Sequence, residues 1–218
     1  GLVRRCLVGG VEVLSQLTTE GFKSLQLLAE NPCKPFDRNR NGINLSEGAA
    51  FLCLEASGEK SLADVTGWGY STDAFHVTSP EPAGRGCFKA MTSALTKAGL
   101  DPKDISWVHC HGTGSHANDL AEGPAVRKLF ADTPAVSTKS IHGHSLAASG
   151  ALEAVVCVQA LLNGRVPATH GLENPDPAIP LRHVRAAEAR PARHIVKNTL
   201  GFGGNNAALV FSLPRGQA

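Results

Sequence analysis

The pattern of apolar and polar positions along this chain of 218 residues predicts two stretches of different character, which meet near residue 60. In the first stretch, apolar residues are spaced partly as in a strand and partly as in an amphipathic helix, and a polar, turn-rich loop interrupts them. We predict an apolar strand-like opening, a helix over residues 11–29, a loop over 33–48 and a short buried strand over 49–56. A domain boundary near residues 57–60 would divide the chain into units 1–57 and 58–218.

Strands and helices alternate in the second stretch, and two of the helices end at Gly99 and Gly164. The predicted order is a strand over 64–71, a helix over 85–98, a strand over 106–111, a helix over 118–130, a strand over 135–139 and a helix over 144–163. Residues 194–213 then give two apolar strands around a glycine-rich turn, which is a hairpin pattern. This alternation indicates an α/β fold with a mixed, largely buried sheet that is covered by helices.

Composition and charge narrow the classes of function. The 21 Lys and Arg side chains against 19 Asp and Glu give a formal charge of +2, which is too small to attract nucleic acid or an anionic membrane. The six cysteines are far apart without a CxxC pair, and no signal peptide precedes them, which is typical of a reduced, cytoplasmic protein. The longest apolar run, within 145–162, is interrupted by Glu153 and Gln159 and is too short for a bilayer, so we expect a buried helix.

The segment "HCHGTGSHAND" is the first that could carry chemistry. His109 and His111 share one face of a strand, because side chains alternate, and Gly112 lets the backbone turn sharply. The same residues would also suit a satisfied histidine pair followed by a helix cap at Asn118 or Asp119. The segment alone does not decide between the two interpretations.

The segment "KSIHGH" contains Lys139, His142 and His144 ahead of an alanine-rich helix. A histidine in the first turn of a helix lies in a field that disfavours its charged form, so His144 would stay neutral and could stabilise an enolate or oxyanion. Lys139 is either a surface lysine or a fixed charge paired with a carboxylate, for which Glu122 is available. The glycines of "GFGGNN", residues 201–206, could form an anion nest, but no GxGxxG or P-loop pattern surrounds them.

Five segments together resemble one family. They are "KPFDRNRNGINLSEGAAFLCLE", "STDAFHVTSPEP", "HCHGTGSHANDLAEGPAV", "STKSIHGHSLAASGALEAV" and "NTLGFGGNNAALVF". In order and spacing they resemble the C-terminal portion of an elongating β-ketoacyl-acyl-carrier-protein synthase, the ketosynthase of fatty-acid and polyketide assembly. The resemblance covers nearly all 218 residues and is far more specific than any single motif.

The resemblance implies a thiolase-like fold, layered α-β-α-β-α, of which this chain is mainly the C-terminal half. It implies a cytoplasmic acyltransferase that performs a decarboxylative Claisen condensation: a cysteine takes the acyl chain, malonyl-acyl carrier protein loses CO2, and the carbanion attacks the thioester. The implied partners are acyl carrier protein and a second subunit, in a homodimer or a ketosynthase-type heterodimer. No cofactor and no metal are implied, since the substrates are carried on the phosphopantetheine of the carrier protein.

The family's site residues carry over to matching positions of this chain. His111 in the "HGT" motif and His144 in "KSxxGH" match two catalytic histidines, which would hydrogen-bond the malonyl thioester oxygen and stabilise the enolate. Lys139 matches the lysine that orders the site, and Glu122 matches its acidic partner. Phe202 matches the gating phenylalanine, whose backbone N–H also serves the oxyanion hole.

Two further expectations concern the substrate arm and the nucleophile. Thr113 and Ser115 match hydroxyl positions that contact the pantetheine arm, with serine where the family usually has threonine. The family's reactive cysteine lies upstream of the region matched by "CLVGGVEV", so we expect it, with the missing N-terminal half, before Gly1, and Cys6 is not that nucleophile. Residues 1–218 alone are therefore expected to be inactive and, with an apolar face uncovered, to aggregate.

Two other classes of function stay open. A non-catalytic subunit similar to a chain-length factor generally loses active-site residues, whereas this chain keeps every one that can be compared; the residue at the nucleophile position would decide. A zinc protein could use His109, His111, His116 and either His142 or His144, but their spacing matches no known zinc signature.

Overall fold

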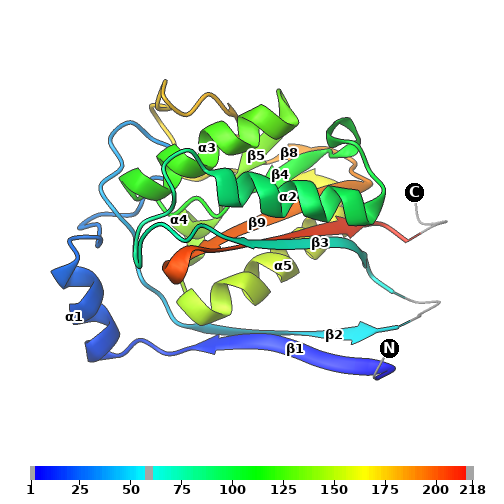
Figure 1. Ribbon diagram of the computed structural model, residues 1–218, viewed down its shortest axis with the longest axis horizontal. Helices are drawn as coiled ribbons and strands as arrows, with labels where there is room; N and C mark the ends of the chain where they lie inside the picture. Colours follow the sequence, from blue (N-terminus) through cyan, green and yellow to red (C-terminus); the bar gives the residue numbers. More distant parts are fainter. Residues whose placement is uncertain (1–2, 57–60, 215–218) are drawn as a thin grey trace.

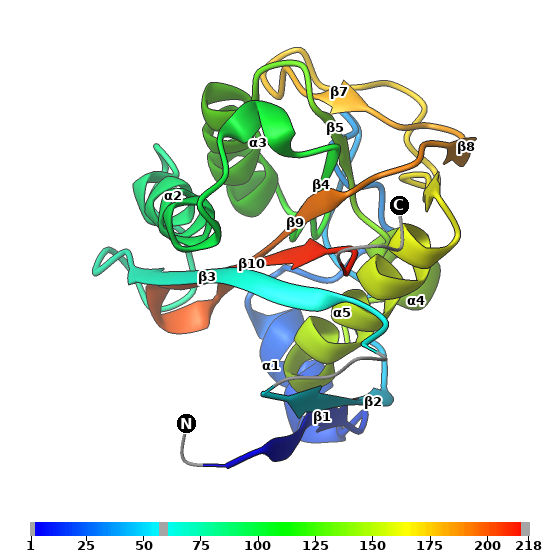
Figure 2. The same cartoon turned by 90° about the vertical axis from the view of Figure 1, so that its right-hand side faces the viewer.

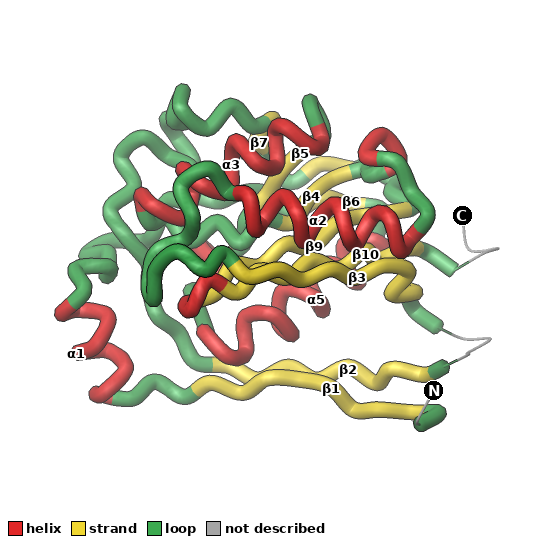
Figure 3. Tube along the Cα trace, in the orientation of Figure 1, coloured by secondary structure: helices red, strands yellow, loops and turns green. Residues whose placement is uncertain are grey.

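A mixed six-stranded sheet is the main element of the computed structural model, which describes residues 3–56 and 61–214. The strand order is β3-β10-β9-β4-β5-β7. The pairs β3/β10 and β10/β9 are antiparallel, whereas β9, β4, β5 and β7 run parallel. The strands are β3 (Asp64–Thr72), β4 (Trp107–His109), β5 (Pro134–Val136), β7 (Arg182–His183), β9 (His194–Gly201) and β10 (Asn205–Ser212). The tube view in Figure 3 shows these strands in yellow, with long helices above and below them.

Helices cover both faces of this sheet (Figures 1 and 2). α2 (Arg85–Ala98) and α3 (His116–Phe130) lie on one face, and α5 (Leu146–Leu162) lies on the other. α2 lies close to β3 because β3 has glycines where the two meet: a Cβ at Gly67 or Gly69 would come within 2.1 Å of a carbonyl oxygen of α2. The remaining short elements are η1 (Pro102–Asp104), α4 (Lys139–His142), β6 (Arg165–Val166), β8 (Glu188–Ala189) and η2 (Phe202–Gly204).

A two-stranded sheet lies on the far side of α5. β1 (Arg5–Glu12) and β2 (Gly48–Glu55) pair antiparallel along their whole length, and α5 runs between them and the large sheet (Figure 2). Gly10 permits the close contact, since a Cβ there would meet the carbonyl oxygen of Ala147 at 2.3 Å. The order of helices, sheet, helix and sheet confirms the layered α/β fold that the sequence predicts.

The helix predicted over residues 11–29 is shorter than expected. Only α1 (Gln16–Ser24) is helical, because β1 continues its pairing with β2 as far as Glu12. The hydroxyl of Ser15 accepts a hydrogen bond from the N–H of Thr18 at 3.1 Å and starts the helix there. Beyond its end, Gln26 has a φ of 56°. Strand pairing therefore overrides the helical spacing of the apolar residues before residue 15.

Two further predictions are corrected. β2 is not a buried strand, since Ala50 alone of its residues is buried: one face packs on α5, and β1 is its partner. The helix predicted over 144–163 begins two residues later than expected, as α5, and His144 lies in the bend between α5 and the short helix α4. The boundary predicted at residues 57–60 lies outside the described residues, so the division into two units stays a prediction.

Several large apolar side chains are exposed on β1, β2 and α1. They include Leu7, Val11, Leu17, Phe51 and Leu54. Such an exposed face is expected where another layer would pack. All six cysteines are free thiols. Within the described residues, we find no helix whose length and apolar character would let it span a membrane.

Candidate active site

The turn that follows β4 carries His111 and Gly112, and a carboxylate of α3 fixes its backbone. The fully buried Glu122 accepts the N–H of His111 at 2.6 Å and the N–H of Gly112 at 2.8 Å. The side-chain amide of Asn198, on β9, donates to the same carboxylate at 2.7 Å. Burial raises the pKa of Glu122, and the two backbone N–H groups oppose that rise. Gly112 has a φ of +43°, and a Cβ there would lie 2.5 Å from Cβ of Ser137, so the turn requires glycine.

A second buried carboxylate of α3 holds the next part of the turn. Asp119 accepts the N–H groups of Thr113 at 3.1 Å and Gly114 at 3.3 Å, and that of Phe36 at 2.8 Å. It therefore joins the loop of residues 33–48 to the turn. The helix cap predicted at Asn118 or Asp119 is wrong, because α3 begins at His116 and Asp119 points to the turn from inside the helix.

Lys139 of α4 is buried against His111. Its Nζ donates to the carbonyl oxygen of His111 at 2.7 Å and to Nδ1 of the same residue at 3.2 Å, and it forms an ion pair with Glu153 of α5. An ammonium only donates, so Nδ1 of His111 accepts and the proton of the neutral ring lies on Nε2. The predicted partner Glu122 is wrong: its oxygens bind backbone N–H groups, and the acid that pairs with Lys139 is Glu153.

Glu153 also pairs with a second lysine that the sequence analysis did not select. Nζ of Lys197, on β9, lies 2.8 Å from Oε2 of Glu153, and all three ionised side chains are buried. Burial alone would raise the pKa of Glu153, but Lys139 and Lys197 outweigh it and hold the pKa well below the usual range. The signal in the sequence was a carboxylate inside an apolar helix, since a buried charge requires a partner.

His144 lies in the bend between α4 and α5. Its N–H donates to the carbonyl oxygen of Asn44 at 2.7 Å, its carbonyl accepts the N–H of Ser46 at 3.1 Å, and its Nδ1 hydrogen-bonds Oγ of Ser149 at 2.9 Å. The ring centroids of His111 and His144 are 5.1 Å apart, and the two ring planes are nearly perpendicular, with an angle of 81° between them. The structure therefore brings together two residues that are far apart in the sequence.

Both imidazoles of this pair are neutral. Burial, followed by the charge of Lys139, lowers the pKa of His144 to about 3 and lowers that of His111 well below its usual value. The principal cause is burial and not the helix field predicted from the sequence, because His144 precedes α5 and is not in its first turn. Two neutral rings can offer N–H donors to an oxygen that gains negative charge.

His109 and His142 form a separate chain through Thr138. Oγ1 of Thr138 lies 3.0 Å from Nε2 of His109 and 2.9 Å from Nε2 of His142. Across the described parts of the chain, no three His, Cys, Asp or Glu side chains are placed to hold a metal ion. The zinc alternative therefore has no geometric support in these residues.

Three further predicted residues lie on the turns that follow β4 and β9. Phe202, on the turn between β9 and β10, is 45% exposed, and its ring stacks on Phe22 of α1 with centroids 5.4 Å apart. Gly203, next to it, has a φ of 79°. The hydroxyls of Thr113 and Ser115 are 2.9 Å apart and form one polar pair directly after the His111 turn.

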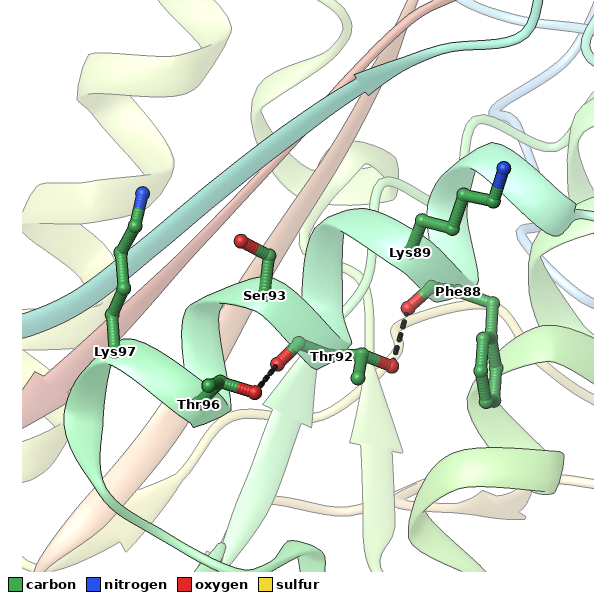
Figure 4. A pocket seen from close by; sticks show the side chains of 6 residues that line it. All are labelled: Phe88, Lys89, Thr92, Ser93, Thr96 and Lys97. Atoms are coloured by element: carbon green, nitrogen blue, oxygen red, sulfur yellow. Dashed lines mark hydrogen bonds between the residues drawn. The ribbon is translucent and has the colours of Figure 1, made fainter.

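A shallow depression on the outer side of α2 shares no residue with this cluster (Figure 4). It is lined by Phe88, Lys89, Thr92, Ser93, Thr96 and Lys97. The hydroxyls of Thr92 and Thr96 donate to carbonyl oxygens one turn earlier in their own helix. The depression therefore offers lysines without an arranged set of polar partners, and the candidate site stays with His111 and His144.

Known proteins are similar to this chain along most of its length. Residues 1–60 match the family described as β-ketoacyl synthase, N-terminal domain, and residues 62–173 match β-ketoacyl synthase, C-terminal domain. The 3-oxoacyl-[acyl-carrier-protein] synthase 2 of Synechocystis sp. is 36% identical over 97% of this chain and 55% of its own length. The protein of that name from Mycobacterium bovis is 39% identical over 94% of this chain and 53% of its own.

A solved structure described as the ishigamide ketosynthase/chain length factor has the same fold. It superimposes with a TM-score of 0.92 and 34% identity, and the match covers 98% of this chain and 55% of that chain. This chain thus spans about half the length of the curated relatives that it matches.

Proposed function

Because the chain belongs to the β-ketoacyl synthase family, we propose that it supplies part of the active site of a condensing enzyme. The enzyme would join an acyl thioester to malonyl-acyl carrier protein with loss of CO2, in fatty-acid or polyketide synthesis. The observation that supports this most is the pair of neutral histidines, His111 and His144, 5.1 Å apart beside the buried Lys139. The curated relatives named above are, in the words of their names, 3-oxoacyl-[acyl-carrier-protein] synthases.

The two rings would stabilise the enolate. His111 presents Nε2–H because Lys139 occupies its Nδ1. We assign the same form to His144, with the hydroxyl of Ser149 donating to its Nδ1 and the proton of the ring on Nε2. When the bond between the malonyl Cα and its carboxylate breaks, the electron pair moves onto the thioester oxygen, and two N–H donors there lower the energy of the charged state.

The new carbon–carbon bond then forms as the enolate attacks the acyl thioester carbon and the enzyme thiolate leaves. We propose that this thiolate belongs to a cysteine outside residues 1–218. Thr113 and Ser115 would contact the pantetheine arm, and Phe202 would gate the site. This chemistry requires no cofactor and no metal of the protein's own, and it fits a cytoplasmic enzyme that acts with acyl carrier protein as a homodimer or a ketosynthase-type heterodimer.

Two substitutions in the encoded full-length protein test the proposal. His111→Ala should lower malonyl-acyl carrier protein decarboxylation and condensation by about 100-fold or more, because it removes one donor to the developing oxyanion. The matched control His116→Ala, five residues away and exposed, should leave both rates unchanged. Unchanged turnover in His111→Ala would refute the assignment.

The non-catalytic alternative makes a different prediction for the unmutated protein. A subunit similar to a chain-length factor would show neither decarboxylation nor condensation by itself. It would also carry a residue other than cysteine at the nucleophile position. The retention of His111, Lys139 and His144 in one cluster favours the enzyme.

A further inference from the structure

Lys197 is a buried lysine to which the proposed reaction gives no task. It lies in the middle of β9, between the buried residues Val196 and Asn198. Its position in the sheet is opposite His109 of the parallel strand β4. Its Nζ contacts Glu153 of α5 and the hydroxyl of Thr199. A lysine is rarely buried without a specific partner, so these contacts require an explanation.

Lys197 is the first member of a chain of contacts that ends at the catalytic pair. Its Nζ lies 2.8 Å from Oε2 of Glu153. The other oxygen, Oε1, pairs with Nζ of Lys139, which in turn donates to Nδ1 of His111. Each link joins a different element, from β9 through α5 and α4 to the turn after β4.

We propose that Lys197 is a positioning residue for the condensation. By holding Oε2 of Glu153, it orients the carboxylate whose other oxygen holds Lys139, and through Lys139 it fixes His111 in its Nε2–H form. The inference deepens the proposed function and rests on it.

The geometry explains why a second lysine is useful. A carboxylate held at one oxygen can rotate about its last bond, and Lys139 would then follow it away from Nδ1 of His111. An ammonium group beside each oxygen attracts both of them and favours one orientation of the carboxylate. A group within hydrogen-bond reach of the reacting atoms is effective only when its own partners are fixed in this way.

Lys197 also contributes charge to the site. The titratable side chains that its charge affects are His109 and His111 of the β4 segment, Lys139 of α4, His144 of the bend, and Glu153 and Cys157 of α5. Its charge opposes protonation of His111 and His144, whereas Glu153 favours it. A lysine that only stabilised the fold could be replaced without moving the pH dependence of the reaction.

The test compares Lys197→Met with Lys103→Met, an exposed control on η1, in the encoded full-length protein. Lys197→Met should lower malonyl decarboxylation by about 10- to 100-fold, as a misplaced catalytic group does. The acid limb of its rate profile should move to higher pH, because the histidine pair is then more easily protonated. Nitrogen-15 NMR of labelled histidine should show the His111 signals departing from those of the Nε2–H form. The control should change none of these.

A folded Lys197→Met variant with an unchanged pH profile and unchanged His111 signals would overturn the inference and leave Lys197 with a role in stability alone. If Lys197→Met does not fold, Lys197→Gln keeps the length and polarity of the side chain and gives the same comparison. The NMR readout needs no turnover. A wild-type protein without condensing activity would therefore refute the proposed function, while the NMR comparison would still decide whether Lys197 controls His111.

Discussion

Replacing Glu153 with glutamine should bring the protein close to unfolding at neutral pH. The substitution keeps the shape of the side chain but leaves Lys139 and Lys197, both buried, without the carboxylate that pairs with them. Removing one partner from a buried ion pair typically costs about 3–5 kcal/mol. Since one carboxylate serves two ammonium groups here, we expect the upper end, about 5 kcal/mol. The free energy of unfolding of a domain is roughly 5–15 kcal/mol, so the loss would be a large share of it.

The loss should depend on pH with a defined sign. Burial already lowers the pKa of Lys139, and Glu153 opposes that effect. In Glu153→Gln, Lys139 loses this carboxylate, so its pKa in the folded state falls further below the unfolded value of about 10.4. Between these two pKa values the unfolded chain binds more protons, and stability therefore rises with pH. The defect should therefore be larger at pH 7 and should shrink as the pH approaches about 10.

Urea unfolding of the encoded full-length protein measures this cost. The control is Glu188→Gln, which removes the carboxylate of an exposed pair with Arg190, 3.0 Å apart, and should cost less than about 1 kcal/mol. A third variant, Lys139→Met with Glu153→Leu and Lys197→Met, should recover most of the stability, because apolar groups of similar volume can replace a buried ion cluster. A cost for Glu153→Gln as small as that of the control would refute the buried ion triad.

Other changes have equally definite outcomes. Burial lowers the pKa of His109 to about 3. The neutral ring therefore contributes to stability above about pH 6.5, and this contribution is lost as the pH falls from there. In a circular dichroism titration, acid unfolding of His109→Gln should have its midpoint at a lower pH than that of the wild type. Gly112 has a φ of +43°, and an added Cβ would meet Ser137, so Gly112→Ala should lower the free energy of unfolding by at least about 2 kcal/mol. Gly150 lies inside α5 with open space where a Cβ would be added, so Gly150→Ala should raise the free energy of unfolding by about 0.5–1 kcal/mol. Thermal unfolding measures both changes. Phe202→Ala loses the stacking on Phe22 and should cost only about 0.5–1.5 kcal/mol, while the distribution of product chain lengths broadens if the residue gates the site.

The sequence predicted best those elements that are determined locally. α2 matches its predicted range of 85–98, because Gly99 adopts a φ of 66° and ends the helix. The hairpin of β9 and β10 also follows from the glycines of its turn. The helix predicted over 11–29 failed for the opposite reason: pairing of β1 with β2 decides its first residues, and that pairing joins segments more than 35 residues apart.

The same distinction holds at the candidate site. His111, Lys139 and His144 lie in short motifs, and the structure brings all three together. The acid that faces Lys139 could not be chosen from the motifs, because Glu122 and Glu153 lie on helices that cover opposite faces of the sheet. Only the packing of these helices shows that Glu153 reaches the lysine.

That separation of the two acids has a physical meaning. The carboxylates of α3, Asp119 and Glu122, bind backbone N–H groups and therefore determine where His111 lies. The carboxylate of α5, Glu153, binds lysines and therefore determines which nitrogen of His111 carries the proton. Position and protonation of the His111 ring are thus controlled from the two faces of the sheet. A change on α3 should displace the ring and leave its proton in place, whereas a change around Glu153 should alter the proton and leave the backbone of the turn intact.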